Sequence, residues 1–99
     1  VSDDECEYNQ KMAKLRMQID EFDGKLLEIL GNRMKVADKI GLLKKEKNVA
    51  ILQNQRWNEI LGKMILEGEE KGLSNEFVMQ LFKAIHQESI SHQEKVINK

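Results

Sequence analysis

The sequence predicts an all-α fold in which three helices per chain, the first of them very long, form an intertwined homodimeric helix bundle. The 99 residues contain no proline, and β-branched runs are few, which favours helices over strands. Apolar side chains recur in steps of three or four through residues 8–47, the spacing of one helix face. About 38 helical residues would span roughly 57 Å, whereas a compact globule of this chain length has a radius of gyration of only about 13 Å. A second copy of the chain is the simplest cover for such a stripe, so we expect a homodimer.

The first helix is expected to run from about Tyr8 to Lys47. Residues 1–7 are acidic and lack periodicity, so we expect them to be disordered or the remnant of a linker, ahead of one helical domain over residues 8–99. The chain starts with valine, which is compatible with a domain excised from a longer enzyme. The apolar face of this helix comprises Leu15, Ile19, Phe22, Leu26, Leu30, Ala37 and Ile40.

Two further helices follow a short apolar connection. Asn54 is the expected N-cap of the second helix, which should continue to about Lys71 and end at Gly72. Ser74 is the expected N-cap of a third helix over residues 75–96. The inner face of the second helix comprises Trp57, Ile60, Leu61, Met64 and Ile65, and that of the third comprises Val78, Leu81, Phe82, Ile85 and Val96.

Two long cations interrupt the apolar stripe of the first helix. Arg33 fills the gap between Leu30 and Ala37, and Lys44 lies one turn beyond Ile40. A charge that faces a core needs a partner, and the stripe offers no carboxylate except at its edge, so a bound anion is the simplest one. The two residues would point the same way about 16 Å apart along the axis. Either side chain alone would be expected to reach the surface, but the two together on one stripe favour a small dianion between them.

Other polar residues fall at stripe positions or stripe edges. Arg16 is too far from Arg33 along its own helix to share a small ligand, but the partner chain's copy could approach it in a crossed dimer. Arg56 lies at the core edge of the second helix, and Ser89 and Gln93 lie one turn apart on the third. Gly41, beside Lys44, would allow close approach of a ligand or of another backbone.

Composition and missing motifs exclude several functions. The net charge is −1, which disfavours a nucleic-acid binder, and no apolar run has the length of a membrane span. Cys6 is the only cysteine, which fits a reducing, cytoplasmic location. His86 and His92 are poorly spaced for joint metal ligation on one helix face, and no phosphate loop, HExxH or CxxC is present. We therefore expect neither metal nor cofactor, and a site that binds an anion or stabilises charge electrostatically.

The pattern of residues resembles the all-helical class of chorismate mutases over about residues 11–93. Each element alone is weak, and the combination is fairly specific. It rests on Leu15-Arg16, Ile19, Asp23, Lys25-Leu26-Leu27, Arg33, Ile40-Gly41, Lys44, Arg56, Gly72-Leu73, Leu81-Phe82, Glu88-Ser89 and Gln93.

The resemblance implies an intertwined dimer with two equivalent sites that convert chorismate to prephenate by a Claisen rearrangement, in phenylalanine and tyrosine biosynthesis. It implies that Arg33 and the partner chain's Arg16 hold the substrate carboxylates and that Lys44 and Gln93 donate to the ether oxygen. Ser89 and Arg56 would support the carboxylates, directly or through water. It also suggests a fused domain with another enzyme of aromatic biosynthesis.

Two positions depart from the pattern, and two alternatives stay open. Many relatives carry an acidic pair near the start of the second helix, where this chain has Gln53 and Trp57. An indole cannot accept the substrate hydroxyl, so that contact would fall to Gln53, backbone or water. This keeps open an isochorismate pyruvate-lyase-like activity. A non-catalytic helical dimerisation or regulatory module would explain the long helix but not the polar residues on its stripes.

Overall fold

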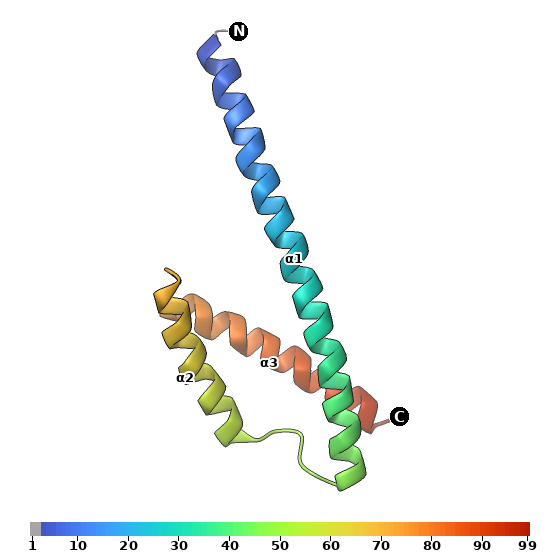
Figure 1. Cartoon of the computed structure of the whole chain (residues 1–99). Helices are drawn as coiled ribbons and strands as arrows, with labels where there is room; N and C mark the ends of the chain where they lie inside the picture. The colour runs from blue at the N-terminus through green and yellow to red at the C-terminus, as the bar shows by residue number, and fades with distance from the viewer. Residues whose placement is uncertain (1–2) are drawn as a thin grey trace. The chain divides into compact units, whose positions relative to one another are not determined.

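The computed structural model describes residues 3–99, and every element in that range is a helix. Three helices follow in order: α1 (Asp3–Lys47), α2 (Asn54–Glu70) and α3 (Asn75–Ile97) (Figure 1). The predicted all-α class with a long first helix is therefore confirmed. The chain divides into two compact units, residues 1–33 and residues 34–99, so that α1 contributes to both.

The first unit consists of the N-terminal part of α1. The helix begins at Asp3, earlier than the start expected near Tyr8, so residues 3–7 are helical; Val1 and Ser2 lie outside the described residues. The first turn carries Asp3, Asp4 and Glu5. Negative side chains there are stabilised by the positive end of the helix dipole, an effect that an argument from apolar periodicity does not register.

The apolar stripe of this first unit is exposed in the single chain. Leu15, Ile19, Phe22 and Leu26 retain 53%, 57%, 67% and 48% of their accessible surface. Four large apolar side chains at helical spacing therefore leave about half or more of their surface in contact with water. The assignment of these four residues to a buried face therefore stays a prediction. Further along α1, Ala37 is buried as expected, whereas Ile40 is 42% exposed and Met34, which the predicted stripe did not include, is buried.

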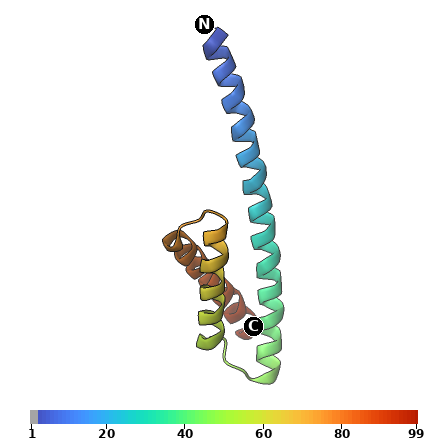
Figure 2. The ribbon, with the colours of Figure 1, turned by 60° about the vertical axis from the view of Figure 1, so that its left-hand side comes forward.

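The second unit is built from the last turns of α1 together with α2 and α3. Its buried apolar residues are Met34 and Ala37 from α1 and Val78 and Ile85 from α3. The predicted inner face of α2 is half-buried, and α2 and α3 lie side by side, joined by a short turn (Figure 2). Gly68 of α2 permits this packing, because a Cβ there would lie 2.6 Å from Cγ2 of Val78.

Apart from the start of α1, the helix ends follow the expected signals with one exception. Asn48 takes a left-handed conformation (φ 54°) just after α1, and Gly72 (φ 80°) does so after α2. The Oγ atom of Ser74 accepts a hydrogen bond from the backbone N–H of Phe77 at 3.3 Å, as expected of an N-cap. The assignment of Asn54 as the N-cap of α2 is wrong. Gln53 occupies that position, with extended backbone and no side-chain cap bond.

None of the helices within residues 3–99 combines the length and the apolar character that crossing a membrane requires.

Candidate functional site

The site is built where α3 crosses the C-terminal part of α1 within the second unit. A Cβ added to Gly41 would lie 2.9 Å from Cα of Gln93 and 3.2 Å from its carbonyl oxygen. The two backbones therefore touch at this point, and the absence of a side chain at Gly41 is what allows it. The structure thus shows one of the two roles left open for Gly41, the close approach of another backbone.

Lys44 lies one turn beyond this contact and is held by two hydrogen bonds. Its Nζ donates to the carbonyl oxygen of Ile51 at 2.6 Å and to Oε1 of Gln93 at 2.9 Å. The side chain is half-buried, and this desolvation lowers the pKa of Lys44 from its ordinary value. The carbonyl of Ile51, in the connection after α1, is a partner that the sequence argument did not identify.

Gln93 links Lys44 to the third helix. It is only 6% exposed, and among residues 3–99 it is the one polar residue that is buried. Its Nε2 donates to Oγ of Ser89, one turn earlier on α3, at 3.1 Å. The polar exceptions predicted on two separate apolar stripes thus meet in one hydrogen-bonded row of Lys44, Gln93 and Ser89.

The row retains the capacity to donate to a ligand. Within residues 3–99, the bonds described use two of the three ammonium protons of Lys44 and one of the two amide protons of Gln93. One proton on each group is left over. Two donors that share a half-buried location, one of them cationic, can stabilise negative charge that grows on a single oxygen atom.

His92, next to Gln93, makes a second polar link across the same helices. Its Nδ1 lies 2.8 Å from Oδ1 of Asp38 on α1, and its Nε2 lies 3.2 Å from Oε1 of Glu88 on α3. The sequence argument missed this link. Asp38 and His92 are far apart in the chain, and no local spacing relates them; their pairing becomes visible once Gly41 and Gln93 are known to touch.

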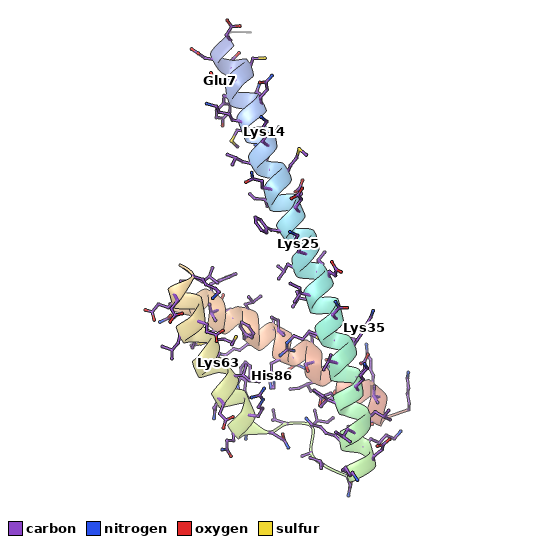
Figure 3. All side chains as sticks on the ribbon, in the orientation of Figure 1. Glu7, Lys14, Lys25, Lys35, Lys63 and His86 are labelled. Carbon is purple, nitrogen blue, oxygen red and sulfur yellow. The ribbon has the colours of Figure 1, made fainter. Side chains whose placement is uncertain are left out.

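The start of α2 forms a shallow depression near a stacked aromatic pair. The depression is lined by Gln53, Arg56 and Glu59 together with Asn54 and Gln55. Trp57 stacks on His86 of α3, with ring centroids 4.2 Å apart and planes 17° apart. His86 lies between α2 and α3 (Figure 3). The stack therefore ties Trp57, one of the two residues that depart from the family pattern, to the helix that carries Ser89 and Gln93.

Arg16 and Arg33 belong to the first unit. Arg16 is exposed, and Arg33 is half-buried. Their part in a binding site stays a prediction, as do the ligand-binding roles of the other site residues. The structure does bring Lys44, Ser89 and Gln93 together, and it places Gln53 and Arg56 around one depression.

The chemistry available in the second unit is electrostatic. Across residues 3–99, no three His, Cys, Asp or Glu side chains are grouped so that they could hold a metal ion. The row of Lys44, Gln93 and Ser89 consists of a cation, a carboxamide and a hydroxyl, and it places no general base beside the hydroxyl. Such an arrangement suits binding of an anion and stabilisation of developing negative charge.

Comparisons with known proteins agree with this chemistry. Residues 15–94 match the family described as chorismate mutase type II. A bifunctional chorismate mutase/prephenate dehydratase of Buchnera aphidicola subsp. Acyrthosiphon pisum is 33% identical over 91 residues, which cover 92% of this chain and 24% of that protein. The protein of the same description from Buchnera aphidicola subsp. Schizaphis graminum is 27% identical over 88 residues, covering 89% of this chain and 23% of the relative. The chain thus spans about a quarter of the length of these curated relatives.

Proposed function

We propose a reaction and a mechanism for this chain from the premise that it belongs to the chorismate mutase type II family. The reaction is the Claisen rearrangement of chorismate to prephenate, so the chain acts as an isomerase. The observation that carries the proposal is the row in which the Nζ of Lys44 and the carboxamide of Gln93 lie 2.9 Å apart with a proton left to donate on each. The family and the relatives at 33% and 27% identity support the same activity.

The mechanism needs no covalent step. In this rearrangement the bond between the ether oxygen and the ring breaks while a carbon–carbon bond forms, and negative charge grows on the oxygen as its bond lengthens. Lys44 and Gln93 donate to that oxygen, and they stabilise the transition state more than the ground state because the charge is larger there. Ser89 holds the carboxamide of Gln93 through its 3.1 Å hydrogen bond, so the donor needs little reorganisation during the reaction.

The two substrate carboxylates supply the binding energy. Arg33 and the partner chain's Arg16 bind them, with Arg56 and Ser89 in support and Gln53 in reach of the ring hydroxyl. Planar guanidinium groups match carboxylates with paired hydrogen bonds, which fixes orientation as well as position. Holding both ends restricts chorismate to the folded conformer in which the reacting carbons meet, and this restriction lowers the entropic part of the barrier.

The proposed active form is a homodimer. The exposure of Leu15, Ile19, Phe22 and Leu26 on the first unit supports it, since a second copy of α1 would bury these side chains. Each copy contributes four such side chains, about half exposed, so their burial would contribute roughly 1 kcal/mol each, or several kcal/mol for the dimer. Sedimentation equilibrium measures the association, and a monomer at micromolar concentration would contradict it.

The test of the function is to incubate the purified chain with chorismate and identify the product. We expect loss of the chorismate ultraviolet absorbance with formation of prephenate, and loss of turnover in Lys44→Ala and Gln93→Ala. Release of pyruvate from isochorismate would instead assign the lyase-like activity. A folded dimer that turns over neither compound would indicate a binding or regulatory module.

The proposal extends to a fused enzyme of aromatic biosynthesis. The names of the two relatives join a chorismate mutase with a prephenate dehydratase in one protein, and this chain corresponds to about a quarter of each. In such an arrangement, the prephenate released by this chain would be the substrate of the neighbouring activity.

A further inference from the structure

We propose that His92 is a positioning residue for Gln93: its imidazole, held by Asp38, fixes α3 against α1 so that the Gln93 carboxamide stays within reach of Lys44. The inference rests on the proposed function of the Lys44 and Gln93 pair. It assigns His92 and Asp38 no contact with the substrate.

The positions of four residues at the helix crossing carry the first step. On α1, Asp38 lies one turn before Gly41, and Lys44 lies one turn after it. On α3, His92 directly precedes Gln93, whose backbone packs on Gly41. The crossing is therefore held by a polar contact on either side of a tight backbone contact. Asp38 and His92 make the first (2.8 Å), and Lys44 and Gln93 make the second (2.9 Å).

The two carboxylates near His92 differ in whether their contact joins two helices. Glu88 lies one turn earlier on the same helix, its side chain is 59% exposed, and its contact of 3.2 Å links α3 only to itself. Asp38 belongs to α1, and its contact is shorter at 2.8 Å. A neutral imidazole has one N–H group. When the proton is on Nδ1, this group donates to Oδ1 of Asp38 and so joins α3 to α1. The contact with Asp38 is thus the one that can fix their relative rotation.

Rotation of α3 at this point changes the geometry of the row directly. Gln93 is 6% exposed, and its main chain has no room to move towards Gly41. If the link between His92 and Asp38 is lost, α3 can still turn about the Gly41 contact, and the carboxamide then moves relative to Lys44. A shift of about 1 Å in a catalytic group is enough to reduce the rate strongly.

The effect should fall on turnover more than on binding. Gln93 and Lys44 act on charge that develops only in the transition state, whereas the arginines bind carboxylates that are charged throughout. We therefore expect kcat to fall about three- to tenfold in Asp38→Ala and in His92→Leu, with KM changed less than about twofold. His92→Gln keeps an N–H that can reach Asp38 and should retain at least about half of the parental kcat.

Glu88→Ala is the matched control, because it removes the other carboxylate from the same imidazole without unlinking the helices. We expect its kcat to stay within about twofold of the parent. Asp38→Ala introduces a better helix former, so a loss of activity in that variant does not reflect a weaker helix. The double variant Asp38→Ala/His92→Leu should be no slower than the slower single variant, because both changes remove the same contact.

The experiment measures kcat and KM on chorismate for the full chain and these variants, together with the NMR signals of the Gln93 side-chain amide. We expect the amide signals to move in Asp38→Ala and His92→Leu and to stay in place in Glu88→Ala. An unchanged kcat and unchanged amide signals in Asp38→Ala would overturn the proposal, and so would equal effects of Asp38→Ala and Glu88→Ala. If the parent does not turn over chorismate, the proposed function fails, and the amide signals still decide whether His92 positions Gln93.

Discussion

Gly41 and Gln93 approach so closely that a methyl group on Gly41 would lie 2.9 Å from the Cα atom of Gln93. The contact joins α1 to α3 next to the two residues proposed to act on the substrate. It explains why a glycine stands in the interior of a helix, where it costs about 1 kcal/mol relative to alanine. The same contact fixes the register at which Lys44 meets Gln93.

Gly41→Ala should therefore destabilise the protein and reduce its activity. Overpacking a tight contact costs about 1–3 kcal/mol, and here the atom that would have to move belongs to the main chain. This exceeds the gain in helix propensity, so we expect a net loss of about 1 kcal/mol or more in the free energy of unfolding. Gly24→Ala is the control, because among residues 3–99 nothing beyond the helix's own backbone lies within 4 Å of a Cβ there, and it should gain up to about 1 kcal/mol. Urea unfolding measures both, and equal effects would contradict the argument.

The stack of Trp57 on His86 predicts a graded loss of stability on truncation of the indole. The rings are 4.2 Å apart and nearly parallel, and Trp57 is half-buried in the single chain. Trp57→Ala should cost about 2 kcal/mol, less than a fully buried tryptophan would, and Trp57→Phe about 1 kcal/mol or less because a ring remains to stack. Thermal unfolding of the two variants beside the parent checks the order. A phenylalanine variant as unstable as the alanine one would show that stacking is not the cause.

The three helices of the single chain could be predicted from the sequence almost completely, because their signals are local, whereas the dimer stays a prediction. The absence of proline, the helical period, and the turn residues Asn48, Gly72 and Ser74 all act within a few residues of where they stand. The errors were also local. The helix dipole favours Asp3 and its acidic neighbours as a first turn, and α2 begins after an extended Gln53 rather than at Asn54. Both concern helix starts, where competing signals are small in free energy.

The site was predictable only in part, because its contacts join residues from separate helices. Lys44, Ser89 and Gln93 could be singled out as polar residues on apolar stripes, and the structure brings them together. The link between Asp38 and His92 leaves no such mark. His92 competes with Gln93 for one stripe position of the third helix, but Asp38 is partly exposed and no local spacing relates it to His92. The same is true of the Ile51 carbonyl, which any residue at that position would supply.

The pH dependence of the reaction should report the protonation of Lys44. Burial lowers the pKa of Lys44 below its ordinary value of 10.5, and only the protonated ammonium can donate to the ether oxygen. Activity is therefore present below this lowered pKa and is lost as the pH rises through it. The alkaline limb of kcat/KM, which reflects the free enzyme, should have its midpoint below 10.5. The alkaline limb of kcat should have its midpoint at a higher pH than that of kcat/KM, because the bound dianion favours the charged form of Lys44. A kcat/KM that stays flat to pH 10.5 would rule out this assignment.

Gln93→Glu should give an enzyme that works only under acidic conditions. At neutral pH the new carboxylate would face the Lys44 ammonium across the present 2.9 Å contact, which keeps it ionised. It would then have no proton to donate and would repel a dianionic substrate, so we expect kcat/KM at pH 7 to fall by about 100-fold or more. Activity should rise as the pH is lowered and the carboxyl group becomes protonated. A pH–rate profile from pH 4 to 8 measures this; a loss of activity that does not change with pH would count against Gln93 as a hydrogen-bond donor.

A mixed dimer tests whether each site combines Arg16 of one chain with Lys44 of the other. Arg16→Ala and Lys44→Ala should each be nearly inactive as homodimers, since every site then lacks one of its cations. In a mixed dimer, one site combines both substitutions and is inactive. The other site takes Lys44 from the Arg16→Ala chain and Arg16 from the Lys44→Ala chain, so it is intact. Random reassociation after unfolding makes about half of the dimers mixed, each with one intact site, so we expect about a quarter of the parental activity to return. A mixture of Arg33→Ala and Lys44→Ala is the matched control, because these two residues would belong to the same chain's site and no intact site could form. Recovery in the control, or its absence in the test mixture, would show that the sites do not share residues in this way.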